Sequence, residues 1–132
     1  MRNPLALWAC FLAILMVGTR AKSETVKSVY DGDTFTLSSG EKIRLACIDT
    51  PEMKNTPKKK ADKPAAIAAR TYLVGLINNQ DLTIDRVTKD LYGRTVARVY
   101  TPSGQELSRE MYLSGHAELF KGFEKPCPWT RQ

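Results

Sequence analysis

Alternating apolar and polar residues predict five short strands in the part of the chain that begins at Lys22. Glycine-, serine- and aspartate-rich turn signals separate the first three strands. Thr50-Pro51 ends the third strand, because proline cannot donate a backbone hydrogen bond and restricts the residue before it. The strands are expected at residues 25–30, 34–37, 42–48, 81–87 and 95–100.

Two helices are expected among these strands. The first covers residues 65–77, with Asp62 as its N-cap and Pro64 in its first turn. The second covers residues 105–114 and ends at Gly115, a common helix stop. Residues 53–63 are rich in Lys and Pro and are expected to form a loop, and no element is predicted beyond Phe120.

The order of these elements predicts the fold class. The 132 residues allow one domain, and five short strands with a helix between the third and the fourth favour a mainly β, α+β fold. A five-stranded OB-fold barrel is the natural candidate at this size. A five-stranded sandwich would show the same alternation, so the strand pattern alone leaves both architectures open.

The N-terminal stretch has a different composition from the rest. A positively charged MRNP segment precedes the apolar run LALWACFLAILMVG, which is shorter than a typical membrane span. Thr19-Arg20-Ala21 then offers small residues where a signal peptidase cleaves. We predict a signal peptide over residues 1–21 and a secreted or periplasmic domain over residues 22–132, with an uncleaved N-terminal membrane anchor as the alternative.

Charge and rare residues narrow the chemistry. The net charge is +6, and residues 1–21 account for two of the 20 basic residues and none of the 14 acidic ones. The rest is therefore basic, which favours partners such as nucleic acid or anionic lipid. His116 is the single histidine and is predicted to be structural, which excludes a Ser-His-Asp triad and a histidine-rich zinc site.

Cys47 and Cys127 are the two cysteines outside the predicted signal peptide. In an oxidising compartment they could form a disulfide. Because Cys47 lies in an apolar run, a buried free thiol is an equal alternative.

Carboxylates suited to a hard cation occur in two segments, DGDT at residues 31–34 and IRLACIDTPE at residues 43–52. Asp33 and Asp49, with the backbone carbonyl of Thr50, would provide oxygen ligands and leave other positions for water and a substrate phosphate. A calcium loop of the EF-hand type is excluded, because its required glycine and glutamate positions hold Thr36 and Lys42. Taken singly, DGDT is also typical of a hairpin turn.

Arginines and a glutamate could complete a phosphodiesterase site. Arg44 and Arg94 present forked donors that match two phosphate oxygens, and Glu52 could accept a proton from attacking water. Arg44 and Asp49 are five residues apart and would point to opposite faces of a regular strand. The site therefore requires the third strand to bend or end before Asp49.

The motifs DGDT, IRLACIDTPE and DLYGR, in this order and spacing, resemble the staphylococcal nuclease (thermonuclease) family from about Val29 to Phe120. The resemblance implies an OB-fold barrel with helices and a calcium-dependent nuclease that cuts DNA and RNA with low sequence specificity. It implies that calcium is bound by Asp33, Asp49 and the Thr50 carbonyl. The phosphate would be held by Arg44 and Arg94.

The same resemblance assigns the remaining roles. It implies that Glu52 activates water, that Asp31 supports the site without binding the metal, and that Tyr92 contacts a terminal phosphate. Lys58 and Lys59, in the lysine-rich loop beside the site, are expected to attract the phosphate backbone without sequence preference. A monomer without stable membrane association is expected after signal cleavage.

The chain also departs from the family pattern. Leu91 replaces a phosphate-binding lysine, Phe120 stands near a base-stacking aromatic position, and the long C-terminal helix is expected to be missing. Lower stability, or a tether from Cys127 to Cys47, would follow. The alternative function is a catalytically inactive OB-fold module that binds nucleic acid or protein, although the five charged residues that such modules tend to lose are all present.

Overall fold

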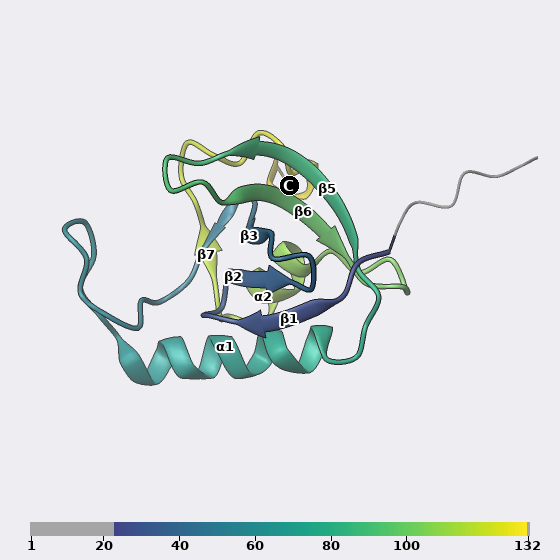
Figure 1. Cartoon of the computed structure of the whole chain (residues 1–132). Coiled ribbons are helices and arrows are strands. Elements are labelled where there is room, and N and C mark those ends of the chain that lie inside the picture. The colour runs from purple at the N-terminus through teal and green to yellow at the C-terminus, as the bar shows by residue number, and fades with distance from the viewer. Residues whose placement is uncertain (1–22, 132) are drawn as a thin grey trace, which may run out of the picture.

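The structure is a computed structural model that describes residues 23–131 (Figure 1). The signal peptide predicted over residues 1–21 lies outside the described residues. The main sheet has the strand order β1-β2-β3-β6-β5, and a second, two-stranded sheet pairs β4 with β7. The strands are β1 (Val26–Val29), β2 (Thr34–Leu37), β3 (Lys42–Leu45), β4 (Ile48–Asp49), β5 (Thr83–Lys89), β6 (Thr95–Tyr100) and β7 (Glu118–Leu119).

The main sheet curls in the manner of an OB-fold. β1, β2 and β3 pair antiparallel in succession, β3 pairs parallel with β6, and β5 pairs antiparallel with β6. Glu24 and Leu82 exchange two backbone hydrogen bonds of 2.9 and 2.8 Å, so the edges of the sheet meet at one bridge. The predicted α+β, OB-like class is confirmed, with a sheet that curls without closing into a continuous ladder of strands.

The core lies between the curled sheet and the two helices, α1 (Lys63–Ile77) and α2 (Leu107–Leu113). Figure 1 shows α1 running along the β1 side of the sheet, while α2 lies behind it. α1 buries residues three or four positions apart, as expected of a helix with one apolar face. Fully buried core residues include Phe35, Leu37, Ile43, Leu45, Leu73, Val99, Leu107 and Met111.

The first helix begins as predicted. The Asp62 side chain accepts a 3.3 Å hydrogen bond from the amide of Ala65, and Pro64 occupies the first turn. Gly32 lies so close to this helix that a Cβ atom there would come within 2.7 Å of the Ala69 Cβ. The glycine of DGDT therefore permits the close packing of α1 as well as a turn.

Several predicted element boundaries differ from the structure, and one short element was not expected. The strand expected at 42–48 is divided into β3 and β4, because Cys47 adopts a left-handed conformation with φ of 72°. β5 continues through Lys89, beyond its expected end, with an irregular register between Arg86 and Thr88. The second helix is shorter than predicted, and a 3-10 turn, Pro128–Arg131, forms where no element was expected.

A disulfide joins Cys47 to Cys127 across 80 residues of sequence. The alternative of a buried free thiol at Cys47 is therefore excluded. The bond attaches the C-terminal segment to the turn between β3 and β4, and Cys127 is fully buried there. His116 packs its ring against Tyr72, with centroids 4.8 Å apart, which agrees with the structural role predicted for it. Between residues 23 and 131, no helix has the length and apolarity needed to span a membrane.

Candidate active site

Three predicted site residues meet where the turn before β2, strand β3 and strand β4 come together. The Arg44 Nη2 atom lies 3.4 Å from Asp33 Oδ2 and 3.6 Å from Asp49 Oδ1. The turn at residues 46–47 makes this possible, because it ends β3 before Asp49 and removes the opposite-face geometry of a continuous strand. The bend that the site requires is therefore present.

Arg44 is buried, with 8% of its surface exposed, and it is held by the backbone. Its Nη1 atom donates to the carbonyls of Leu45 (2.7 Å) and Ile48 (2.8 Å). The guanidinium also lies 5.6 Å from the centre of the Phe120 ring. One edge of the guanidinium is thus bonded to the protein, and the other edge faces the two carboxylates.

Asp33 is positioned by two further hydrogen bonds. The Thr34 hydroxyl donates to Oδ1 at 2.9 Å, and the Thr50 amide donates to Oδ2 at 3.2 Å. These contacts join the turn before β2 to the end of β4. Thr50 itself is almost completely buried, so its backbone is a rigid part of the site.

Arg94 approaches from the start of β6 and contacts the site through Thr34. Its Nη1 atom donates to the Thr34 hydroxyl at 3.2 Å, and its guanidinium lies 5.5 Å from the centre of the Tyr92 ring. Tyr92 is 81% exposed and available to a ligand. Of the two arginines predicted to hold a phosphate, Arg44 therefore lies beside Asp33, and Arg94 is linked to Asp33 through the Thr34 hydroxyl.

Asp90 is a positioning residue that the sequence analysis did not identify. One of its oxygens accepts hydrogen bonds from the amides of Tyr92 and Arg94, both at 2.9 Å, and the other lies 2.6 Å from Arg94 Nε. The signal was present in the motif DLYGR, because an aspartate at the first position of a turn that ends in glycine commonly bonds to the following amides.

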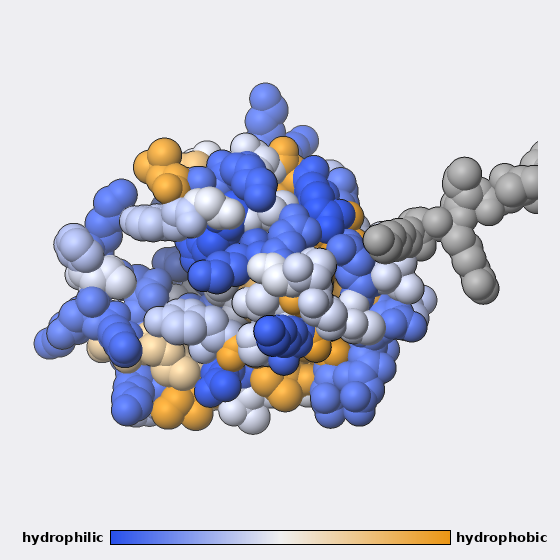
Figure 2. All heavy atoms as spheres, viewed as in Figure 1, coloured by the Kyte–Doolittle hydropathy of each residue, from blue (hydrophilic) through white to orange (hydrophobic). Residues whose placement is uncertain are grey.

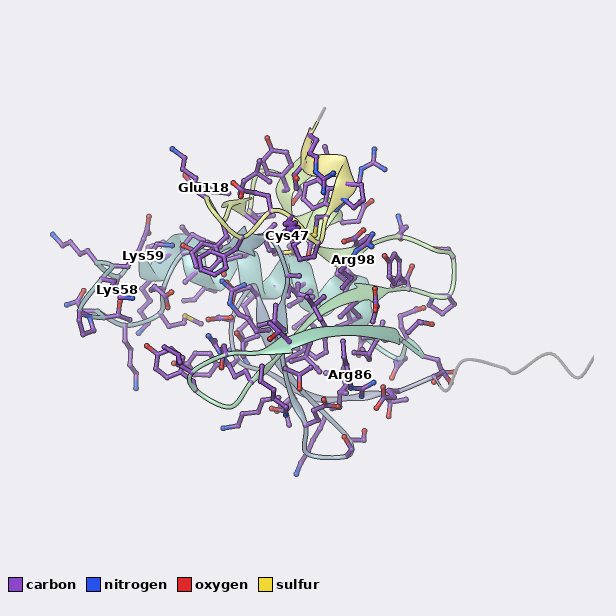
Figure 3. All side chains as sticks on the ribbon, turned by 90° about the horizontal axis from the view of Figure 1, so that it is seen from above. Cys47, Lys58, Lys59, Arg86, Arg98 and Glu118 are labelled. Carbon is purple, nitrogen blue, oxygen red and sulfur yellow. A yellow bond between two sulfur atoms is a disulfide. The ribbon has the colours of Figure 1, made fainter. Side chains whose placement is uncertain are left out.

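The lysine-rich loop places one ammonium group in the site. Lys59 Nζ lies 2.9 Å from Asp49 Oδ2 and donates to the Thr50 carbonyl at 2.8 Å. Lys58 is on the same loop but is exposed to solvent (Figure 3). The two lysines predicted to contact substrate are therefore in different situations, since Lys59 contacts two predicted metal ligands directly.

Burial and neighbouring negative charge raise the pKa values of two acidic side chains at this site. Burial, reinforced by the charge of Asp33, raises the pKa of Asp31 to about 7, and Asp31 Oδ1 accepts a 3.0 Å bond from the Asp33 amide. Burial and the same neighbouring charge also raise the pKa of Glu52, while Lys59 opposes this shift. The site is rich in negative charge and favours an additional cation.

The donor set fits a hard divalent cation. Two carboxylates and a backbone carbonyl are the oxygen ligands that calcium accepts, and the Lys59 ammonium already lies on two of these groups as a stand-in cation. Within the described part of the chain, no three His, Cys, Asp or Glu side chains are grouped as a metal centre. The protein would therefore provide a partial shell, to be completed by water and substrate.

The comparison with protein families decides the relationship. Residues 42–132 match the family described as staphylococcal nuclease homologue, which is more than half of the chain. The chain belongs to the staphylococcal nuclease family. This match contains Arg44, Asp49, Glu52 and Arg94, and the geometry above brings Asp33 to the same place.

Several curated proteins are similar to this chain in sequence. Endonuclease YhcR of Bacillus subtilis is 34% identical over 105 residues, which cover 72% of this chain and 9% of that protein. The thermonuclease of Staphylococcus intermedius is 38% identical over 86 residues, 61% of this chain and 50% of that protein. An uncharacterized endonuclease of Escherichia coli is 28% identical over 101 residues, 74% and 61% of the two chains.

The chain thus spans less than two thirds of the length of each of these three proteins. The predicted departure at Leu91 lies on the loop between β5 and β6, where that side chain is fully exposed. Phe120, the candidate base-stacking residue, packs on Phe123 with ring centroids 4.4 Å apart, beside Arg44.

Proposed function

We propose that the protein is a calcium-dependent phosphodiesterase that hydrolyses DNA and RNA with low sequence specificity. The observation that carries the proposal is the position of the Arg44 guanidinium. Backbone carbonyls hold one edge of this group, and the other edge lies between the carboxylates of Asp33 and Asp49. Membership of the staphylococcal nuclease family, with relatives named as endonucleases and a thermonuclease, supports it.

In this proposal, different residues bind the metal and hold the phosphate during phosphodiester hydrolysis. Calcium bound by Asp33, Asp49 and the Thr50 carbonyl would supply positive charge to a phosphate oxygen. Arg44 and Arg94 hold the phosphate by paired hydrogen bonds and stabilise the extra negative charge of the transition state.

Glu52 is the group that receives a proton from the attacking water. Its pKa is raised by burial and by the charge of Asp33, which makes its carboxylate a stronger base than an exposed glutamate. Asp31 supports the turn by accepting the Asp33 amide and does not bind the metal.

Low sequence specificity follows from the kind of contacts that the site offers. Figure 2 shows hydrophilic residues over the lysine-rich loop, and an indentation between this loop and the β5–β6 turn above it. Cations and exposed Tyr92 on these borders would contact phosphates, which carry no base information. Nucleic acid of either kind could therefore enter by its backbone.

Secretion belongs to the same proposal. Residues 1–21 have the composition of a signal peptide, and the Cys47–Cys127 disulfide is the kind of bond that persists in an oxidising compartment.

A plasmid-cleavage assay tests the proposed function. Supercoiled DNA incubated with the protein and calcium is expected to be nicked and then degraded, and excess chelator is expected to stop the reaction. Arg94→Ala should lower the rate without removing the fold. If the wild-type protein retains DNA in a gel-shift assay and leaves it uncut in calcium, the protein is a binding module instead.

A further inference from the structure

We propose that Lys59 is a built-in competitor for the divalent cation of this site, and that cation binding releases Lys59 from it. The inference rests on the proposed metal site and adds a mode of regulation to it. In the structure, the Lys59 ammonium lies 2.9 Å from Asp49 Oδ2 and 2.8 Å from the Thr50 carbonyl oxygen.

The ammonium and a metal ion would use the same oxygens. Calcium binds carboxylate and carbonyl oxygens at about 2.3–2.6 Å, so it needs the lone pairs that Lys59 now engages. Asp49 and Thr50 contribute two of the three protein ligands proposed for the metal. Both cations cannot therefore be fully bound at one time.

The loop is folded so that it presents Lys59 to the site. Lys59 forms a tight turn with Thr56, in which the Thr56 amide donates to the Lys59 carbonyl at 2.9 Å and the Lys59 amide donates to the Thr56 hydroxyl at 3.0 Å. The Ala61 amide donates to the Asn55 side chain at 2.8 Å, which braces the same loop. Lys58 and Lys60, beside Lys59, are exposed.

Lys59 can leave the site, whereas Arg44 is fixed in place by backbone hydrogen bonds. Arg44 donates two hydrogen bonds to backbone carbonyls and is 10% exposed at its side chain. The Lys59 side chain is 38% exposed, and its ammonium contacts only Asp49 and the Thr50 carbonyl among the described residues. The arrangement can lose Lys59 to solvent without breaking the fold.

Competition of this kind weakens the apparent affinity for the metal. When only a fraction of the protein has the site open, the apparent Kd rises by the inverse of that fraction. An ammonium held by a carboxylate and a carbonyl would keep the site closed most of the time, so we expect an effect of roughly five- to tenfold. The released ammonium would then be free to contact a phosphate of the substrate.

Calorimetric titration with calcium, in the absence of nucleic acid, measures the effect. Lys59→Met should bind calcium roughly five- to tenfold more tightly than the wild type. Lys60→Met is the matched control, because it removes one positive charge from an exposed position of the same loop, and its Kd should change by less than about twofold. Equal changes in both variants, or no tightening in Lys59→Met, would overturn the proposal.

Chemical labelling of lysines gives a second measurement on the wild-type protein. Acetylation followed by mass spectrometry should show Lys59 reacting more slowly than Lys60 in chelator, and calcium should raise the rate at Lys59 alone. A rate at Lys59 that does not respond to calcium, while the titration shows binding, would overturn the proposal.

These outcomes are separable from the proposed function. If calcium binds and releases Lys59 but DNA stays uncut, the competition holds and the nuclease activity fails. If calcium-dependent cleavage occurs and Lys59 does not respond, only the competition fails. A wild-type protein that binds no calcium would contradict both.

Discussion

Two arginines of this protein each lie between two carboxylates, and they differ in almost every other respect. Arg86, on β5, contacts Glu24 and Glu41 at distances between 2.6 and 3.3 Å. Arg44, on β3, lies 3.4 and 3.6 Å from its two aspartates. Figure 3 shows Arg86 well away from the loop that carries Lys58 and Lys59.

The Arg86 cluster is closed on itself. Its hydrogen bonds lower the pKa of Glu41 to about 2, and Glu41 also accepts a 2.7 Å bond from the Thr95 hydroxyl. The three charged side chains join the segment before β1, the turn before β3, and β5. The cluster stabilises the curled sheet and leaves no carboxylate oriented toward a ligand.

The Arg44 cluster is open. The guanidinium directs its shorter hydrogen bonds to backbone carbonyls and lies farther from the two aspartates, of which Asp49 also contacts the partly exposed Lys59. Neighbouring acidic groups, Asp31 and Glu52, have raised pKa values as a result of burial and mutual repulsion. An arginine between two carboxylates can therefore form a closed structural cluster or an open one, depending on how many of the arginine donors the backbone engages.

The largest predicted effect separates the two arginines by activity. Arg44→Ala should lower DNA hydrolysis by on the order of 10³-fold, because it removes a phosphate donor and leaves the buried Asp33 carboxylate without its arginine. Arg86→Ala is the matched control and should keep the rate within about twofold. Plasmid cleavage in calcium measures both. Comparable losses in the two variants would mean that Arg44 acts only through stability.

The next effect concerns the turn that brings Arg44 and Asp49 together. Replacing Cys47 and Cys127 by serine should lower the free energy of unfolding by about 2–4 kcal/mol, because the disulfide closes a long loop. Denaturant unfolding measures this loss. Cleavage should fall as well, while the coupling between Arg86 and Glu41 in a double-mutant cycle should stay constant. A disulfide-free protein with undiminished stability would contradict the tethering role.

The third prediction concerns the Asp90–Arg94 ion pair, which we expect to position Arg94 for the candidate active site. Asp90→Ala should lower cleavage by roughly tenfold, because Arg94 loses the carboxylate that aims its guanidinium. Added to Arg94→Ala, the same substitution should have almost no further effect, since both act through one side chain. Steady-state kinetics of the two single variants and the double variant measure this. Additive losses would show that Asp90 acts elsewhere.

The smallest expected effect is a loss of stability at acidic pH, which arises from Glu41 in the Arg86 cluster. The folded-state pKa of Glu41 is lowered from its ordinary 4.5 to about 2, so its stabilisation is complete above pH 4.5 and is lost as the pH falls toward 2. Glu41→Gln should be less stable than the wild type by at most about 1 kcal/mol at pH 7, and this difference should shrink as the pH falls through 2. Unfolding free energies of both proteins across this range would show the convergence, and a constant difference would contradict it.

Local patterns predicted most of the elements. Asp62 and Pro64 placed the start of α1, and alternation placed β2 and β6 with the observed bounds. The division of the third strand into β3 and β4 was the main feature that these patterns did not predict. A left-handed Cys47 has no local signal, and it is maintained by a disulfide and by a 2.8 Å bond from the Phe120 amide, both far away in sequence.

The site was predictable as a set of residue types but not as a set of contacts. Motif spacing indicated Asp33, Arg44, Asp49 and Arg94. It did not indicate that Lys59 would contact Asp49, because residues 53–63 have a composition typical of a solvated loop. The turn at Thr56–Lys59, which directs that side chain, combines backbone hydrogen bonds with bonds to the Thr56 hydroxyl, and the composition of the loop does not specify this arrangement.

Side-chain chemistry, charge and turn preferences are local properties, so the amino-acid order alone sufficed for most of the strand and helix pattern and for the acidic and basic residues of the candidate site. The choice of an OB-like barrel over a sandwich came from the resemblance to a family. Which carboxylates share an arginine, which lysine contacts Asp49 and whether the cysteines pair depend on distances that the local sequence does not set. These residues come close together only in the folded protein, in which the sheet is curled and α1 packs against Gly32.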